Sequence, residues 1–533
     1  MLPIISGVVL TLLPAFGWLP VLNQQQLGWH IWQQLFIQPS FWAASGLTWW
    51  SGWLATLASL FIAALLLQYG FAQQRFALLS RWLSAMLAVP HAAYALGLFA
   101  LLAATGWPAR IWALGSGEQL PPQIALTQDP YGLSLALTLA LREVPFLLLM
   151  ALAAFRTLNL APLLRQARLL GYGEPQAFWP VVVPQLLPVL RWPIMVVLAY
   201  NLGVVDVALI TGPSLPPTLA VMVHQWFVDP DLTMRLVAAA GGIWLTLMIM
   251  LACALWWGIE KLIIAICMTR QWPRQTFGFA WLAKLSSILL LTAWLLGAAW
   301  LLFWAFARRW RFPDLWPEQW QLRSWLRTSS DWWPALVDTL VVGVASATLA
   351  LVLVIGLLEG VGQLKRWQRP LLFVPLILPQ VGFLFFVPGM LARIGIGYGY
   401  GAAITLHLLF VLPYSYLLLE RAYLSLNLQY EQHALLLSKS RWRALWRVKW
   451  PLLAPAFASV FAVGFSVSVA QYLATLYASA GRIETITTLT VSAAGGGDRR
   501  LIAVFALLQW LLPFLVFLVM AWVSHWRSRW QRA

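Results

Sequence analysis

Few side chains within the long apolar segments of this sequence could take part in chemistry. Arg142 and Glu143 are adjacent in LALREVPFLL, and Asp206 lies in NLGVVDVALITG. Gln471, in VAQYLATLY, is the approximate counterpart of Asp206 in the second half of the chain. Because charge is costly within hydrocarbon, we predict that these four residues line a path for a polar solute. The alternatives are a structural ion pair at Arg142 and Glu143, and a helix–helix hydrogen bond at the other two positions.

The sequence lacks the residue patterns of common catalytic sites. It contains no phosphate-binding G-x-x-x-x-G-K-[ST] loop, no HExxH or GxSxG motif, and its six histidines are dispersed. The two cysteines, Cys253 and Cys267, form no metal-binding motif. Asp229 and Asp231 are the one tight acidic pair expected outside, and we interpret them as a turn and helix cap. A membrane enzyme is therefore disfavoured, and we expect no ATP hydrolysis by this chain.

The composition indicates an all-α polytopic membrane protein. Of 533 residues, 61% are hydrophobic and 10% are charged. Windows of about 20 apolar residues recur along the chain, and each can cross about 30 Å of hydrocarbon as a helix. The net charge of +17 fits basic residues collected in cytoplasmic loops better than it fits binding of nucleic acid.

Twelve spanning segments are predicted, near residues 3–21, 49–70, 81–104, 131–155, 191–211, 236–262, 281–306, 333–358, 370–391, 400–420, 455–477 and 501–524. The first lacks a basic flank and a cleavage site, which predicts a retained helix. The loop 23–48 has no Lys or Arg, so we place it outside. The cytoplasmic side then receives Arg75, Arg81, Arg156, Arg165, Arg168, Lys261, Arg270, Arg274, Lys365, Arg366, Arg369, the cluster within 439–449, Arg527, Arg529 and Arg532. Both termini are predicted to be cytoplasmic, whereas the arginine-rich loop 307–332 falls outside.

An internal repeat relates the two halves of the chain. Pro145 in the first half matches Pro413 in the second. Ala167, Pro184 and Pro188 match Ala434, Pro451 and Pro455 in the same way, and the separation within each pair is nearly constant at half the chain. The repeat predicts two tandem six-helix halves, 1–268 and 269–533, related by an axis along the membrane normal.

A long cytoplasmic loop occupies the same place in each half, at 156–190 and 421–455. The first contains RQARLLGYGEPQAFWPVVVPQLLP and the second QHALLLSKSRWRALWRVKWPLLAP. Each predicts a short helix, a turn at a small residue, a second helical stretch, and a proline where the next span begins. Gly171 and Gly173 would permit the turn in the first loop, and Ser438 would do so less easily in the second.

Both loops resemble the EAA loop of type I binding-protein-dependent ABC importer permeases, with the pattern E-A-A, three residues, G, nine residues, I, one residue, L-P. The matching residues are Arg165, Gln166, Ala167, Gly171, Val181, Val183 and Pro184 in the first loop, and Gln432, His433, Ala434, Ser438, Val448, Trp450 and Pro451 in the second. Neither loop has the acidic first residue, and only the first keeps the glycine. The resemblance covers nearly the whole chain, and the fused two-half form looks like thiamine and iron(III) importer permeases.

This resemblance implies a transport subunit without its own cofactor. Two loops would couple this subunit to two cytoplasmic ATPase subunits, which use ATP and Mg. The loop residues that carry the resemblance are Ala167, Gly171, Pro184, Ala434, Ser438 and Pro451. A periplasmic solute-binding protein would deliver the solute to this multi-pass protein of the bacterial inner membrane. No nucleic acid is expected as a partner. A secondary transporter driven by an ion gradient is the alternative function.

The second loop contains a basic cluster, KSRWRALWRVKWP at 439–451. Its residues Arg441, Arg443, Arg447 and Lys449 could pair with acidic groups of an ATPase subunit or with anionic headgroups of the lipid bilayer. Both interpretations stay open at the level of the sequence.

Overall fold

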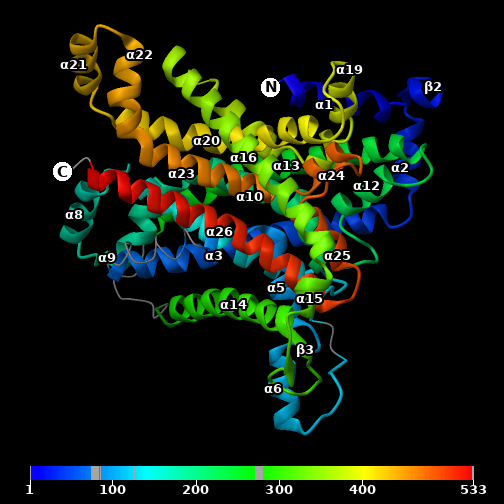
Figure 1. Cartoon of the computed structure of the whole chain (residues 1–533). Coiled ribbons are helices and arrows are strands. Elements are labelled where there is room, and N and C mark those ends of the chain that lie inside the picture. The colour runs from blue at the N-terminus through cyan, green and yellow to red at the C-terminus, as the bar shows by residue number, and fades with distance from the viewer. Residues whose placement is uncertain are drawn as a thin grey trace.

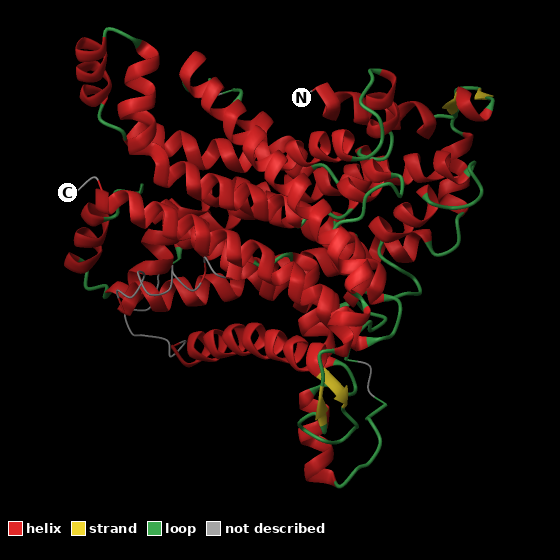
Figure 2. Cartoon of the chain, viewed as in Figure 1, coloured by secondary structure: helices red, strands yellow, loops and turns green. Residues whose placement is uncertain are grey.

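The computed structural model describes residues 2–73, 83, 86–123, 126–155, 157–270, 280–365 and 367–530. Predicted cytoplasmic residues Arg75, Arg81, Arg156, Arg274, Arg366 and Arg532 lie outside this described part. Helices dominate the chain (Figure 2), and two short hairpins, β1–β2 (Trp18–Leu19 and Gln24–Gln25) and β3–β4 (Ala307–Arg309 and Gln319–Trp320), are its strands within the described residues. The prediction of an all-α polytopic membrane protein is confirmed.

The helices of the first half of the chain are α1 (Leu2–Ala15), α2 (His30–Ile37), α3 (Phe41–Gln73), α5 (His91–Leu102), α6 (Trp107–Ser116), α7 (Leu133–Phe155), α8 (Ala161–Leu169), α9 (Glu174–Ala177), α10 (Val183–Gly203), α11 (Asp206–Thr211), α12 (Leu219–Phe227) and α13 (Met234–Thr269). Those of the second half are α14 (Ala280–Phe306), α15 (Arg323–Arg327), α16 (Ser329–Gly360), α17 (Val374–Ile377), α18 (Gln380–Phe383), α19 (Val387–Arg393), α20 (Tyr400–Ser425), α21 (Leu428–Ser438), α22 (Arg441–Ala444), α23 (Trp450–Val469), α24 (Leu473–Ser479), α25 (Ile486–Ala494) and α26 (Arg499–Trp530). Figure 1 shows the long helices running side by side in one bundle.

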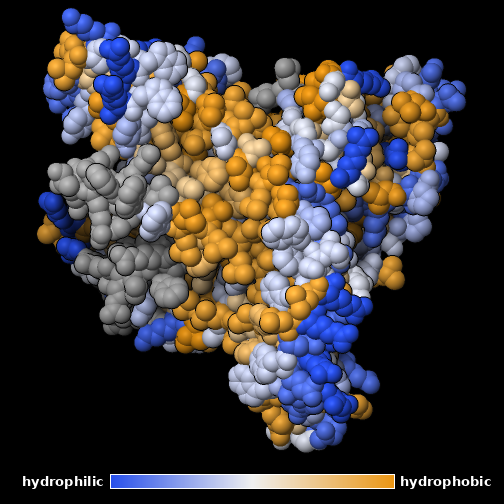
Figure 3. All heavy atoms as spheres, in the orientation of Figure 1, coloured by the Kyte–Doolittle hydropathy of each residue, from blue (hydrophilic) through white to orange (hydrophobic). Residues whose placement is uncertain are grey.

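Ten helices among the described residues are long and apolar enough to cross a membrane, and one bent helix pair brings the number to eleven. An apolar band covers the middle of the face in Figure 3, with hydrophilic residues toward both ends of the bundle. Every one of the twelve predicted segments contains a helix, but the first is short, the ninth is bent, and 191–211 and 455–477 each contain a break between two helices.

The first predicted span, 3–21, is too long. Helix α1 has 14 residues, which is about 21 Å and less than the hydrocarbon thickness. The chain leaves the helix at Gly17, whose φ of +90° is a left-handed conformation that glycine adopts readily.

The ninth predicted span, 370–391, is broken. Residues Arg369–Ile377 and Gln380–Arg393 meet at 95°. Leu378 is extended, with ψ of 132°, because the ring of Pro379 disfavours a helical conformation in the preceding residue.

The first helix of each half packs on helices of both halves. Helix α14 lies against α26 and also against α5 and α3, while α1 lies against α13 and also against α18 and α19. Glycines permit these crossings: a Cβ at Gly97 of α5 would meet the carbonyl oxygen of Gly297 of α14 at 3.1 Å, and one at Gly7 of α1 would meet that of Phe383 at 2.6 Å. The reciprocal contacts fit two halves of the same design, although the boundary between 268 and 269 remains a prediction.

Loop 307–332 lies at the end of the bundle opposite α8 and α21 (Figure 1), as the span count predicts. Here the buried Arg110 of α6 donates hydrogen bonds to the carbonyl oxygens of Arg311 and Thr105, at 2.6 and 2.8 Å. Its guanidinium also lies 4.8 Å from the ring centroid of Trp310. These contacts fold the loop onto α6, while the side of the membrane that each end faces remains a prediction.

Candidate functional site

The first predicted coupling loop is a helix, a left-handed turn and a second helix that continues into a span. Helix α8 ends as the N–H of Tyr172 bonds to the carbonyl of Ala167 at 3.0 Å. Gly171 makes the turn with φ of +84°, the conformation that favours glycine after a helix. Gly173 has φ of −74° and precedes α9, so the turn depends on Gly171 and does not need the second glycine.

The second loop has the same build with a different turn residue. Lys439, with φ of +49°, is the left-handed residue after α21, whereas Ser438 is the last residue of that helix. The prediction that Ser438 makes the turn was therefore wrong by one position. The Ser438 hydroxyl instead donates to the carbonyl of Ser440 at 3.0 Å. This hydrogen bond spans Lys439 and stabilises its left-handed turn, which contains no glycine.

Both loops then contain a five-residue π-helix, Phe178–Val182 in the first and Leu445–Lys449 in the second. In each, the N–H of the next residue, Val183 or Trp450, bonds five residues back. The following proline, Pro184 or Pro451, has no N–H and crowds the carbonyl four residues earlier, so a wider turn relieves the clash. The π-helix of each loop thus runs into the following span without a break, and Pro184 and Pro451 are the second residues of α10 and α23, in the first turn as predicted.

The matched alanines of the two loops are buried. Ala167 in α8 is 5% exposed and Ala434 in α21 is 6% exposed. Each is the buried residue of its short helix among those whose side chains are described, so each fixes how that helix lies on the bundle.

Leucines at matched positions are exposed on both loops. Leu169 and Leu170 in the first loop and Leu436 and Leu437 in the second are between 65% and 88% exposed. Leu169 corresponds to Leu436, and Leu170 to Leu437, at the same offset that relates the buried alanines. Sequence reasoning missed this surface, although the double leucine after each matched alanine is visible in both loops.

The basic cluster of the second loop divides into two groups. Lys449 lies 3.0 Å from a carboxylate oxygen of Glu359 in α16 and 2.9 Å from one of Glu431 in α21. Arg441 donates to the backbone carbonyl of Glu359 at 2.7 Å. Arg443 and Arg447 are exposed, with no ion pair to a described residue. Lys449 and Arg441 therefore hold the loop on α16.

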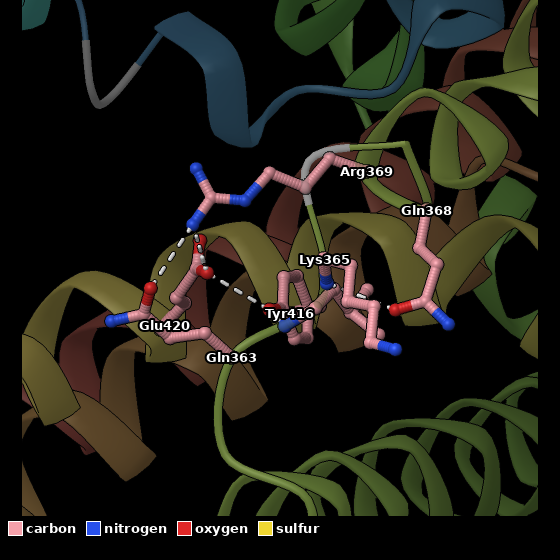
Figure 4. Close-up of polar contacts among 7 residues, drawn as sticks. Gln363, Lys365, Gln368, Arg369, Tyr416 and Glu420 are labelled. Carbon is pink, nitrogen blue, oxygen red and sulfur yellow. Dashed lines mark hydrogen bonds and ion pairs between the residues drawn. The ribbon is translucent and has the colours of Figure 1, made fainter.

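A second ionic contact lies in the segment that follows α16 (Figure 4). Arg369 donates to Glu420 of α20 at 2.8 Å, and the hydroxyl of Tyr416 donates to the same carboxylate oxygen at 2.8 Å. That hydroxyl also accepts a hydrogen bond from the N–H of Leu364 at 2.9 Å. The predicted cytoplasmic residue Arg369 thus ties the segment to α20.

The intramembrane charges Arg142 and Glu143 turn to different partners. Arg142 donates to the carbonyl of Val89 at 2.8 Å and lies 5.8 Å from the ring centroid of Trp294 in α14. Glu143 lies 3.1 Å from Nε2 of His91 in α5. Both charged residues are buried, and Glu143 pairs with a histidine that sequence reasoning had passed over as dispersed. Arg142 and Glu143 therefore bind separate partners and do not form an ion pair with each other.

Asp206 and Gln471 lie at corresponding breaks in the two halves. Asp206 begins α11 just after α10 ends, and Gln471 lies between α23 and α24. Gln471 is buried and accepts a hydrogen bond from Gln380 at 3.2 Å. Asp206 is half-buried and within electrostatic range of Tyr200 and Tyr472, which come from the two halves. Tyr414 of α20 is in turn within range of Arg142 and Glu143.

These positions assemble polar groups of both halves in the bundle interior. Asp229 and Asp231, by contrast, form the predicted turn: the N–H of Asp231 bonds to the carboxylate of Asp229 at 2.8 Å, and that of Thr233 to the carboxylate of Asp231 at 2.9 Å. No cluster of three or more metal-ligating side chains occurs in the part of the chain that the structure describes.

Comparison with known proteins finds a relative that aligns with this chain over most of the length of both proteins. The chain is 28% identical over 496 residues to the inner membrane ABC transporter permease protein YnjC of Escherichia coli (strain K12), and the alignment covers 93% of this chain and 90% of that protein. No known protein-family model matches the chain.

Proposed function

We propose that this chain is the permease subunit of an ABC importer in a bacterial inner membrane. The observation that carries the proposal is the pair of loops, half a chain apart, with the same order of helix, left-handed turn, π-helix and proline-containing span. The similarity to an inner membrane ABC transporter permease over 93% of the chain supports it.

In this function the two loops receive motion from separate ATPase subunits. Closure of the ATPase subunits on ATP and Mg would press on α8 and α21, and the continuous helices would pass the movement to α10 and α23. The two halves, 1–268 and 269–533, would then alternate between access from either side. A periplasmic binding protein would supply the solute.

The exposed leucines are the part of each loop that fits an ATPase groove. Water-exposed apolar side chains at a matched place on two loops favour a shared partner surface. Leu437 lies in the last turn of α21, and Leu170 directly follows α8, so both lie at the end of a short helix whose position the buried alanine fixes. We therefore assign the contact with the two ATPase subunits to these leucines rather than to the basic cluster.

Co-purification from the native host tests this assignment. We expect an ATPase at about two copies per chain with the wild type, and at least a ten-fold loss with Leu170→Glu and Leu437→Glu together. Leu120→Glu and Leu326→Glu are the matched control, because these leucines are exposed in loop and helix segments away from α8 and α21. Retention of an ATPase by the loop variant, or its absence from the wild type, contradicts the proposal.

The buried polar groups are the proposed solute path. Glu143→Gln preserves the shape of the side chain and removes its charge beside His91. We expect uptake to fall at least ten-fold while the ATPase subunits still co-purify. Uptake at the wild-type rate would instead assign Glu143 and His91 to a structural contact between α7 and α5.

A further inference from the structure

One face of the second loop is exposed and carries two tryptophans and two arginines. Trp442 and Trp446 are 67% and 64% exposed, and Arg443 and Arg447 beside them are exposed as well. The two Trp–Arg pairs are four residues apart, so they lie on one side of the helix formed by α22 and the π-helix. Acidic residues are absent from the whole segment 439–451.

This face continues onto a membrane-spanning helix. The ring of Trp450, the first residue of α23, lies 4.6 Å from that of Trp446 and 6.3 Å from that of Trp442 between centroids. Leu452, further along the same apolar helix, is exposed. The row of tryptophans therefore joins the loop to a surface that hydrocarbon covers.

The chemistry of the face matches a phospholipid headgroup region. Tryptophan rings prefer the boundary between hydrocarbon and water. Arginine binds phosphate through paired N–H donors, and cations near an anionic membrane surface are attracted to it. A row of tryptophans flanked by two unpaired arginines presents both features at one depth.

The other source of negative charge, an acidic ATPase surface, fits less well. A contact made with an ATPase subunit by each loop should use features that both loops have, such as the exposed leucines. The positions that match Trp442, Arg443, Trp446 and Arg447 in the first loop are Pro175, Gln176, Trp179 and Pro180, so the arginines have no counterpart. A feature confined to one loop favours the bilayer.

We propose that the face made by Trp442, Arg443, Trp446 and Arg447 binds the phosphate headgroup of an anionic phospholipid such as phosphatidylglycerol. The two tryptophans set the depth of the loop in the headgroup layer, and the two arginines hold the phosphate. The second loop is thereby anchored to the bilayer on one side and to α16, through Lys449, on the other.

Native mass spectrometry of the purified full chain tests this site. Detergent-solubilised protein is mixed with phosphatidylglycerol or with phosphatidylcholine, and the retained lipid is counted. We expect Arg443→Gln with Arg447→Gln to lower phosphatidylglycerol retention at least five-fold and to leave phosphatidylcholine retention unchanged. Arg308→Gln with Arg327→Gln is the charge-matched control, because these exposed arginines lie at the opposite end of the bundle, and it should retain wild-type levels.

Each other outcome overturns the proposal. Unchanged phosphatidylglycerol retention in the loop variant would show that Arg443 and Arg447 do not bind this lipid. An equal loss of phosphatidylglycerol in the control variant would show that net charge alone causes the effect. Loss of ATPase co-purification with lipid retention intact assigns the arginines to the ATPase subunit. Arg443→Lys with Arg447→Lys keeps both charges but loses the paired N–H donors, so it should retain more phosphatidylglycerol than the glutamine variant and less than the wild type; retention below that of the glutamine variant contradicts the proposal. The lipid measurement uses the isolated chain, so its result is independent of whether the chain is an importer subunit.

Discussion

Lys449 of the second loop and Glu359 of α16 lie 3.0 Å apart between ammonium and carboxylate. Their side chains are 11% and 13% exposed, and Glu431 approaches the same ammonium from α21. At the other end of α16, Thr339 accepts a hydrogen bond from the N–H of Ile486 at 2.8 Å. One helix therefore touches a loop at one end of the bundle and the start of α25 at the other.

Loss of the Lys449 ammonium should detach the second loop. Lys449→Met leaves two partly buried carboxylates without this cation, and the cost should fall below the roughly 3–5 kcal/mol of a fully buried pair because both carboxylates keep some contact with water. We expect a lower temperature of thermal unfolding and ATP hydrolysis that no longer depends on solute. Lys449→Arg keeps the charge and should preserve most of both properties; equal behaviour of the two variants would contradict a role for the charge.

The buried alanines of the loops predict a second coupling defect. Ala167→Glu with Ala434→Glu places carboxylates where the side chains are almost fully covered, so both short helices should lift from the bundle. We expect the protein to remain in the membrane while ATP hydrolysis is uncoupled from transport. Ala167→Ser with Ala434→Ser adds one small polar atom at each place and should transport at more than half the wild-type rate. Wild-type transport by the glutamate variant would refute the coupling role.

Most of the fold could be predicted from the sequence because hydrophobicity alone decides which segments cross a membrane. Apolar runs located the long spanning helices but not short ones such as α2, α6 and α12, and the count of spans placed loop 307–332 at the end opposite the two coupling loops despite its arginines. The missed features depend on local backbone geometry. The prolines and glycines of 374–390 indicate an irregular helix there but not a bend of 95° at Pro379, and Gly17 ends α1 before it is long enough to cross.

The candidate site was only partly accessible to sequence reasoning. Repeat spacing found Ala167 and Ala434 as matched residues of the two loops, and the structure adds that both are buried. The partners of charged residues could not be found, because they come from distant segments of the chain. His91 reaches Glu143 from another helix, and Glu359 reaches Lys449 from the end of α16.

The crossing of α5 and α14 predicts a steric effect. A Cβ at Gly97 would already lie 3.1 Å from the backbone of Gly297, so Gly97→Leu should push the two helices apart and cost about 1–3 kcal/mol. We expect less folded protein after extraction, measured by size-exclusion chromatography. Gly258→Leu is the matched control, because a Cβ at Gly258 meets nothing within 4 Å. Equal yields of the two variants would contradict the predicted close contact.

The start of α7, the helix that carries Arg142 and Glu143, predicts a pH-dependent stability. The carboxylate of Asp129 accepts hydrogen bonds from the N–H groups of Leu133 and Ser134 at 2.8 and 2.7 Å. Partial burial alone would raise the pKa of Asp129, but these backbone hydrogen bonds outweigh it and lower the pKa below its ordinary value. The folded state therefore favours the ionised form, so the stabilisation is present above the ordinary aspartate pKa of about 4 and is lost as the pH falls further.

Asp129→Ala should accordingly lower the stability of the protein at pH 7 by about 1 kcal/mol, as loss of a helix cap does. Thermal unfolding of both proteins in the same detergent, repeated from pH 7 down to pH 3, measures the difference. We expect the difference to be constant between pH 7 and pH 5 and to shrink below about pH 4, because the wild-type carboxylate is then protonated. Glu118→Ala removes an exposed carboxylate and should change stability little. A difference that grows on acidification would mean that protonated Asp129 stabilises α7 better than the ionised form, which contradicts the hydrogen-bond geometry.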